Sequence, residues 1–311
     1  MAKASRNVIL LAKIQPTPGT DSVPTPAANA ILCSEPKVNP LNVNIVKRNN
    51  VMAWMGNPGS VVASNYATIE FEVEMQSSGT AGTAPKDGPL MRGCAMGETL
   101  VALTSAAYAP VDTAHEFLSF YYWLDGLKHI FTDAKGTVSY EWNAQGIAVK
   151  KYKFWGLYVS ITDVANPSGS DYSGFKDPLP FNKLNTTTFT LHGIAVKVKS
   201  LTLDLANQVE HINKPNFEGI QIINRMPVGN IVYEVDAISV KDWYTVVKAG
   251  TLGAIAVVHG ATAGFIVAQD APKVQLTSLD YTPDQGIAHC TSSLNLQPNN
   301  AVGTELVTTY R

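Results

Sequence analysis

Few of the residues that commonly carry out catalysis or bind metals stand at the spacing that such chemistry requires. The six histidines include no H-E-x-x-H pair or other metal-ligand spacing. His289 and Cys290 are neighbours, but on a strand they would point to opposite faces, which prevents joint metal binding or activation of the thiol. No G-x-S-x-G elbow is present, and Gly79-Thr80-Ala81-Gly82 lacks the lysine of a phosphate-binding loop. The sequence therefore predicts a protein that is not an enzyme and uses no metal or cofactor.

The acidic side chains follow a clearer pattern. Residues 69–76 alternate strictly between apolar and polar types, which is typical of a strand with two unlike faces. A second segment, residues 231–236, has a similar sequence. Carboxylates two residues apart on one face repel one another, so this face must be in contact with water. The residues expected there are Glu70, Glu72, Glu74, Glu234 and Asp236.

Aromatic residues gather in two stretches, 117–123 and 152–158. They could form a stacking platform for bases or sugars, but no basic residues surround them, so packing in a core or interface is the better interpretation. The formal net charge of −2 also argues against a general nucleic-acid binder. A monomeric β-sandwich module that binds a carbohydrate-type ligand remains the alternative.

The composition describes the surface and the cellular setting. Charged residues make up 15% of the chain, against about 25% in an average globular protein. The surface must therefore be covered by neutral polar side chains or be partly buried against other chains. Cys33, Cys94 and Cys290 are far apart and odd in number, which predicts no disulfide framework and a reducing compartment. The apolar stretch 251–268 is interrupted by glycines, which predicts two buried strands and no membrane span.

The elements that must position these residues are mainly strands. Residues 1–40 are proline-rich and predict an extended arm, and residues 164–188 predict a linker. Between and after these breaks lie two β domains, residues 41–163 and 189–311. Each is expected to hold one short helix. The first begins near Gly88-Pro89, and the second follows the capping-box pattern Ser239-Val240-Lys241-Asp242.

Several landmarks recur in the same order in the two halves, which indicates an internal duplication. Each helix follows one of the two acidic strands. Farther on, Leu124-Asp125-Gly126 answers Val258-His259-Gly260, and Asp133-Ala134 answers Asp270-Ala271. Finally, Gln145-Gly146-Ile147-Ala148 answers Gln285-Gly286-Ile287-Ala288. The spacing between these later landmarks stays nearly constant, which predicts two tandem domains of one fold.

In its short sequence motifs, the chain resembles the major tail tube proteins of long-tailed, siphovirus-like bacteriophages, in the branch with a doubled tube domain. The resemblance runs nearly end to end, although Met91-Arg92-Gly93-Cys94-Ala95-Met96 departs from the family pattern, which more often reads Leu-Arg-Ala-Cys-Gly. The words that carry it include Leu10-Leu11-Ala12-Lys13-Ile14, Glu72-Val73-Glu74-Met75, Gly88-Pro89-Leu90, Phe154-Trp155-Gly156-Leu157-Tyr158, Leu203-Asp204-Leu205-Ala206-Asn207, Asn224-Arg225-Met226-Pro227-Val228-Gly229 and Asp284-Gln285-Gly286-Ile287.

The resemblance implies a structural subunit of the virion tail, assembled in the cytoplasm of the host bacterium. Its fold would be a β-sandwich or half-barrel whose sheets join between neighbours. Such subunits stack as rings into the tube that delivers the genome into the host cell. The implied partners are further copies of the chain, tail terminator and distal tail proteins, and double-stranded DNA in passage. Two domains per chain predict three chains per pseudo-hexameric ring.

Three expectations follow for particular residues. The acidic face, with Glu70, Glu72, Glu74, Glu234 and Asp236, should line the lumen, because an acidic wall gives DNA no counterion release by which to adhere. The alternative is an outer face in contact with solvent. Lys150, Lys151 and Lys153 should point outward or pair with carboxylates of other subunits. The flexible segments 16–39 and 77–87 should contact neighbouring subunits or rings, and the core of the second is Ser78, Gly79, Thr80, Ala81, Gly82 and Thr83.

Overall fold

The computed structural model describes residues 3–311 and is mainly β, as the sequence predicts. Short helices interrupt the strands at α1 (Pro26–Asn29), α2 (Gly88–Gly93) and α3 (Trp243–Lys248). The strands of the first half are β1 (Val8–Ile14), β2 (Ser34–Lys47), β3 (Ser60–Glu74), β4 (Met96–Val101), β5 (Ser105–Pro110), β6 (Leu118–Leu124), β7 (Leu127–Asn143), β8 (Val149–Tyr158) and β9 (Thr162–Asp163).

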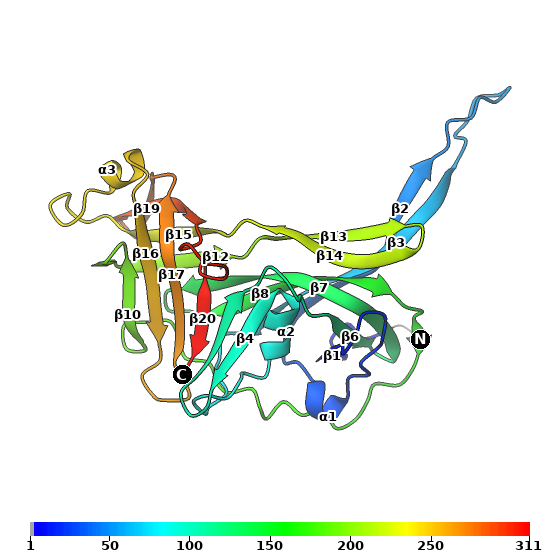
Figure 1. Cartoon of the computed structure of the whole chain (residues 1–311), viewed down its shortest axis with the longest axis horizontal. Helices are drawn as coiled ribbons and strands as arrows, with labels where there is room; N and C mark the ends of the chain where they lie inside the picture. Colours follow the sequence, from blue (N-terminus) through cyan, green and yellow to red (C-terminus); the bar gives the residue numbers. More distant parts are fainter. Residues whose placement is uncertain (1–2) are drawn as a thin grey trace.

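The second half also consists mainly of strands (Figure 1). Its strands are β10 (Thr186–Leu191), β11 (Ile194–Ala195), β12 (Val198–Asp204), β13 (Asn207–Lys214), β14 (Phe217–Arg225), β15 (Val228–Glu234), β16 (Leu252–His259), β17 (Val267–Leu276), β18 (Asp280–Asp284), β19 (Ile287–Leu296) and β20 (Val307–Tyr310). Strand β16 is one of the two strands predicted within the stretch 251–268, but the second, β17, begins only at Val267 and runs on beyond it. No helix among the described residues is both long enough and apolar enough to cross a membrane.

The two halves share one strand order. In the first half the antiparallel neighbours run β2-β3-β8-β7-β6-β1. In the second half they run β12-β15-β19-β17-β16-β10. In both, one short helix follows the second strand of this order, since α2 follows β3 and α3 follows β15. The registers agree as well, because Glu74 faces Val149 as Glu234 faces His289. The two halves therefore repeat one order of strand pairing.

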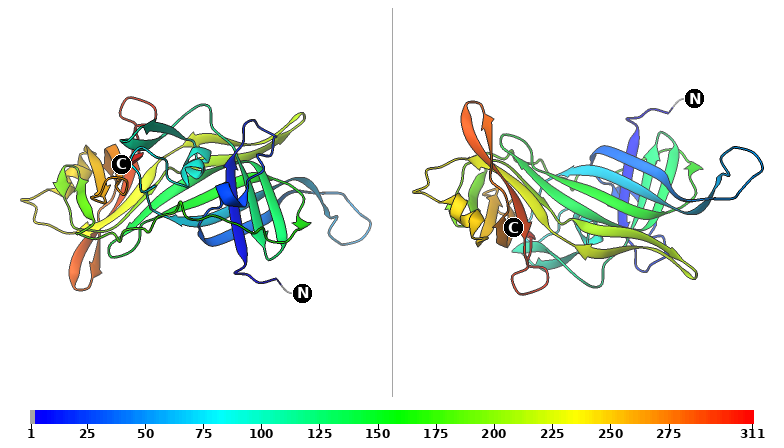
Figure 2. Two further views of the ribbon diagram at one scale, coloured as in Figure 1. Left: turned by 90° about the horizontal axis from the view of Figure 1, so that it is seen from below. Right: turned by 90° about the horizontal axis from the view of Figure 1, so that it is seen from above.

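The halves are joined into one sheet. Strand β12 pairs with β15 on one side and with β7 on the other. This continues the sheet through eight antiparallel strands in the order β2-β3-β8-β7-β12-β15-β19-β18. Strand β20 makes a second connection, since it pairs with β17 and with β5. Figure 2 shows the long sheet from both sides.

The core lies on one face of this sheet. In β3, alternate side chains are buried, and they include Ile69, Phe71 and Val73. Phe71 stacks on Tyr152 and Phe154 of β8 at centroid distances of 5.6 and 6.1 Å. Helix α2 contributes buried Leu90 and Met91 to the same cluster. The strict alternation of residues 69–76 therefore determines which face of the sheet stays wet.

A charged pair is buried within this core. The Lys150 Nζ lies 2.5 Å from the Asp87 Oδ2, and both side chains are fully buried. Lys150 also donates to the Tyr310 hydroxyl at 3.1 Å, and the Tyr152 hydroxyl donates to Asp87 at 2.9 Å. Since Tyr310 belongs to β20, the pair connects the first half to a strand added from the far end of the sequence.

Residues 8–14 differ from the predicted extended arm. They form β1, which pairs with β6 over its whole length and buries Leu10, Leu11 and Ala12. The prolines that suggested an arm lie after this strand, so the composition of the segment concealed the apolar run Val8-Ile9-Leu10-Leu11-Ala12. Helix α1, with Pro26 in its first turn, was not predicted either. Both predicted helices are present, and α3 is capped by Asp242, whose carboxylate accepts from the Thr245 amide.

Candidate functional site

The two ends of the eight-stranded sheet are open edges. Within residues 3–311, β2 pairs only with β3, and β18 pairs only with β19. Most residues of β2 and of β18 are exposed. Unpaired edges are templates for pairing with another chain. The molecule therefore presents two open strand edges at opposite ends of a single sheet.

The junction between β7 and β12 is an internal example of such pairing. It joins the last strand of the first half's four-stranded run to the first strand of the second half's run. Its register sets Ser139 opposite Asp204 and Tyr140 opposite Leu203. In the second half, β18 occupies the place that the end of β7 occupies in the first half. Tyr281 of β18 faces Cys290 of β19, and Tyr140 of β7 faces Lys150 of β8. Strand β2 takes the place of β12 beside β3.

The wet face of the first half carries alternating charges. Glu70 of β3 pairs with Lys153 of β8 at 2.7 Å. Lys151 lies 3.3 Å from Glu72 and 2.6 Å from Glu141 of β7. The hydrogen bonds from Lys151 and Asn143 hold the pKa of Glu141 below its usual value. Because these side chains are solvated, each pair is worth little stability, and its main effect is to offset the acidic charge.

The expectation for the three lysines was wrong for Lys150. Lys151 and Lys153 lie on the wet face and pair with carboxylates of their own chain. Lys150 lies between them in the sequence and therefore points to the opposite, buried face, where it pairs with Asp87. The acidic face is consequently not a purely negative wall, because two lysines of β8 stand directly opposite Glu70 and Glu72.

The wet face of the second half is nearly neutral. Asn230 and Val232 of β15 occupy the places of Glu70 and Glu72 in β3. Glu234 pairs with Lys197 at 2.8 Å. Asp236 lies beyond the end of β15 at Glu234, so it is not on the strand face where the sequence pattern put it. The two halves thus share their backbone plan and differ in the charge they display.

The predicted contact loop, residues 78–83, is half-buried against its own chain. The Gly79 amide donates to the Gly264 carbonyl at 3.0 Å, so the loop reaches the turn between β16 and β17. Gly82 has a positive φ of 76°, and a Cβ there would lie 2.3 Å from the Leu103 backbone nitrogen, so only glycine fits. The loop helps to join the two halves. Its contact with a neighbouring subunit remains a prediction.

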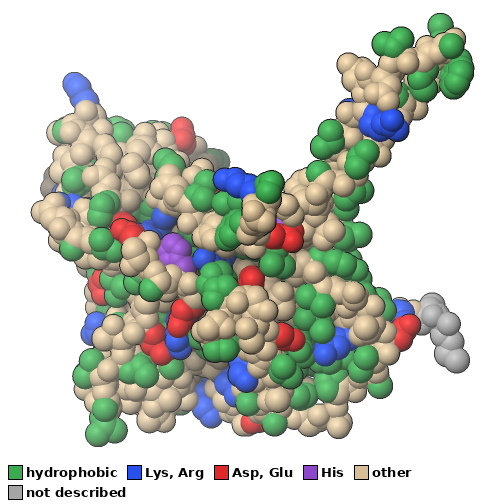
Figure 3. Space-filling model, turned by 45° about the vertical axis from the view of Figure 1, so that its right-hand side comes forward, with side chains coloured by type: hydrophobic (Ala, Val, Ile, Leu, Met, Phe, Trp, Pro, Cys, Tyr) green, Lys and Arg blue, Asp and Glu red, His purple; other side chains and the backbone are tan. Residues whose placement is uncertain are grey.

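The outer part of the β2–β3 hairpin stands clear of the body (Figure 1). We call residues 43–62 the projecting hairpin. Hydrophobic side chains are exposed along both of its strands and at its tip, together with Lys47 and Arg48 (Figure 3). The exposed hydrophobic residues are Val43, Ile45, Val46, Val51, Trp54, Met55, Val61 and Val62.

The second half has a hairpin at the matching place, formed by β13 and β14 between β12 and β15, and it lies against the first half. The Asn207 side chain donates to the carbonyls of Cys94 and Gly136 at 2.8 and 3.0 Å. Farther along, the His211 ring lies 5.2 Å from the Tyr66 ring of β3. Val209 and Ile220 are buried.

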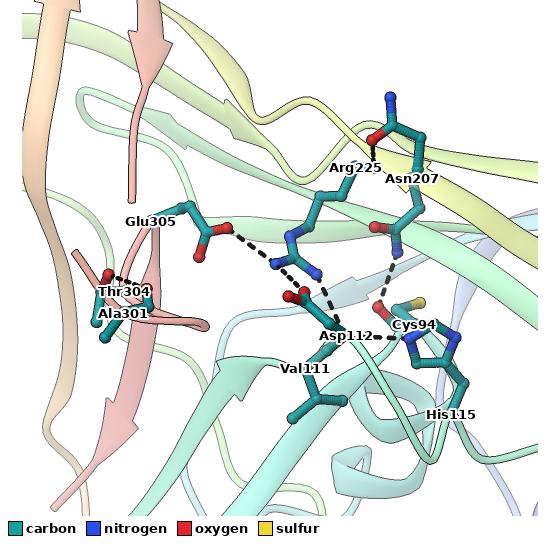
Figure 4. A network of polar contacts seen from close by, with 10 residues as sticks. Cys94, Val111, Asp112, His115, Asn207, Arg225, Ala301, Thr304 and Glu305 are labelled. Carbon is teal, nitrogen blue, oxygen red and sulfur yellow. Dashed lines mark hydrogen bonds and ion pairs between the residues drawn. The ribbon is translucent and has the colours of Figure 1, made fainter. Parts of the chain in front are cut away.

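Arg225 anchors the base of this hairpin (Figure 4). Its guanidinium donates to Glu305 at 2.8 Å, to Asp112 at 2.9 Å and to the Val111 carbonyl at 3.3 Å. The His115 ring contacts the same carbonyl at 3.1 Å, and burial lowers its pKa. A groove of about 590 Å³ opens beside this network, lined in part by Ile223 and Val302.

Sequence reasoning found the alternating face and missed the features that depend on distant partners. The buried Lys150–Asp87 pair, the Arg225 network and the open edges all join segments far apart in the chain. One local signal was present for the pair. Lys150 stands at a position of its strand where the alternation of apolar and polar residues calls for an apolar side chain. Among the described residues, no cluster of three or more potential ligands is arranged to hold a metal ion.

The wet sheet face, the open edges and the projecting hairpin suit a structural subunit better than an enzyme. A search of curated proteins found no match. A model of the phage tail tube protein family matches residues 5–299, which is nearly the whole chain. The chain therefore belongs to the phage tail tube protein family.

Proposed function

We propose that the chain forms rings by pairing β2 of one copy with β18 of the next, and that stacked rings make the tube through which the genome passes into the host cell. The observation that supports this most directly is the β7–β12 junction, where the same two kinds of edge already pair inside one chain. Head-to-tail pairing of unlike edges closes into a ring when the rotation allows it.

Three chains per ring follow from the duplication. Each half supplies one four-stranded unit, β2-β3-β8-β7 or β12-β15-β19-β18. Each half, with boundaries near residues 41–163 and 189–311, is therefore proposed to be one tube domain, and three copies give six domains. Assembly would take place in the host cytoplasm, and the tube ends would meet tail terminator and distal tail proteins.

The internal junction also predicts the register between chains. Asp280 takes the place of Ser139, and Asn39 takes the place of Asp204, because Asn39 faces Thr68 as Asp204 faces Val228. Since Ser139 faces Asp204 within the chain, Asp280 is expected to face Asn39 of the next copy. Facing residues in an antiparallel pair have Cα atoms about 4.5–5.5 Å apart, which a disulfide can span.

A cysteine pair tests this register. The variant Asn39→Cys/Asp280→Cys should give covalently closed trimers on mild oxidation, seen on denaturing gels, and electron microscopy should show rings. The control Val38→Cys/Asp280→Cys places one side chain on the other face and should crosslink poorly. Burial raises the pKa of the native Cys33 thiol to about 12 and that of Cys94 and Cys290 as well, so the background should be low. A chain that stays monomeric would instead favour a β-sandwich binding module.

The wet face of the long sheet is proposed to line the channel, with Glu70, Glu72 and Glu74 among its residues. The support is that the other face is occupied by the core, so the face in contact with water is the one available to a lumen. Replacing these three residues with lysine should leave the core intact and slow genome release at low salt, because a basic wall binds DNA by counterion release. Equal rates of genome release at low salt for the unchanged protein and the triple lysine variant would reject the proposal that this face lines the channel.

A further inference from the structure

The projecting hairpin leaves apolar side chains uncovered on a two-stranded ribbon. Val46, Val61 and Val62 are more than half exposed, and Trp54 stands at the tip. Long exposed hydrophobic strands are rare in isolated proteins because they invite pairing and aggregation. A second surface must therefore cover this ribbon when the protein is in its assembled form.

The β13–β14 hairpin indicates where such a surface lies. It emerges from β12 and β15 as the projecting hairpin emerges from β2 and β3. It then lies over the half whose edge strand, β7, pairs with β12. One point of contact is the stacking of His211 on Tyr66. If β2 pairs with β18 of another copy, the same geometry carries the projecting hairpin over the second half of that copy.

The matching contact position on the second half is uncovered and apolar. Met226 precedes Val228 by two residues, as Tyr66 precedes Thr68, so Met226 takes the place of Tyr66. Met226 is 62% exposed, and Val228, two residues farther along the chain, is also exposed. The first half is covered at this place by β13–β14, whereas the second half has nothing over it among the described residues.

We propose that the projecting hairpin of one copy lies across the second half of its neighbour in the same ring, against Met226 and Val228. The strand register places Val46 within one residue of the position that His211 occupies, since Val46 faces Val61 and His211 faces Ile220, so Val46 lies at the expected contact with Met226. This proposal rests on the proposed ring.

The test is a second cysteine pair, Val46→Cys/Met226→Cys, in the full chain. On mild oxidation it should give covalently closed trimers at a yield at least about tenfold above that of Val46→Cys/Leu184→Cys, because docked thiols are held at a high effective concentration. Leu184 is a suitable control since it is highly exposed and lies outside the proposed surface. Both positions tolerate cysteine because neither Val46 nor Met226 is buried.

The outcomes separate this proposal from the proposed ring. If Asn39→Cys/Asp280→Cys gives trimers and Val46→Cys/Met226→Cys does not exceed its control, the ring stands and the docking of the hairpin is wrong. A ladder of covalent species beyond the closed trimer would mean that the hairpin reaches another ring, which also overturns the proposal. If the first pair also fails, the ring itself is rejected.

Discussion

The two long hairpins of this chain occupy the same place in a duplicated fold and meet different fates. The β13–β14 hairpin lies on the first half, held by Arg225, Asn207 and the His211–Tyr66 contact. The β2–β3 hairpin stands free, with aliphatic side chains exposed on both strands. The difference is one of position, because only β12 has a neighbouring half within the chain. One hairpin has its partner in the same molecule, and the other needs a second molecule.

The largest expected effect concerns a buried side chain of the packed hairpin. Ile220→Ala should lower the free energy of unfolding by about 2–5 kcal/mol, because Ile220 is fully buried and a cavity would remain. Val46→Ala on the free hairpin should change it by less than about 0.5 kcal/mol. Urea unfolding of the isolated monomer measures both. Similar losses for the two variants would mean that the free hairpin is also packed in the monomer.

A smaller loss is expected when the anchor of the packed hairpin is removed. Arg225→Ala leaves the nearly buried Glu305 carboxylate without its cation and should cost about 1–3 kcal/mol. Arg225→Lys should recover part of this loss, since a lysine keeps the charge but lacks the fork of donors. Arg48→Ala on the free hairpin is the matched control and should leave monomer stability unchanged. A stable Arg225→Ala variant would show that the network does not hold the hairpin.

The contact between the His211 side chain of the packed hairpin and the Tyr66 side chain of β3 should contribute less to stability again. A double-mutant cycle with His211→Ala and Tyr66→Ala should give a coupling energy of about 0.5–1.5 kcal/mol in the monomer. The matching cycle with Val46→Ala and Met226→Ala should give no coupling in the monomer. Any coupling between the latter two residues should arise only on assembly.

The smallest effect should come from pH at the base of the packed hairpin. Burial lowers the pKa of His115, and the nearby Lys135 and Arg225 charges lower it further. The unfolded chain therefore binds a proton more readily than the folded chain, so stability should fall as the pH drops through about 6.5 and below. His115→Gln should reduce the part of this pH dependence that His115 contributes, measured as the difference in unfolding midpoint between pH 7.5 and 5.5. An unchanged slope would exclude His115 as its source.

Local patterns predicted those parts of the fold that local physics determines. The alternation of residues 69–76 identified the wet and buried faces, and the Asp242 region marked the start of α3. The β1 strand was missed because its short apolar run lies in a proline-rich segment and becomes a strand only by pairing with β6. Likewise, nothing local distinguishes a hairpin that packs from one that projects. That distinction depends on which half lies beside it.

The strand β20 has a consequence for synthesis of the chain. Tyr310 contacts the buried Lys150, and β20 pairs with β5, so the first half lacks part of its core until residue 310 has been translated. About 200 residues separate β5 from β20, which corresponds to about 10–40 s at bacterial elongation rates of about 5–20 residues per second. During this interval the nascent first half carries an incomplete core around Lys150. The first half therefore cannot complete its core when its own residues have been translated, and must wait until β20 has been added.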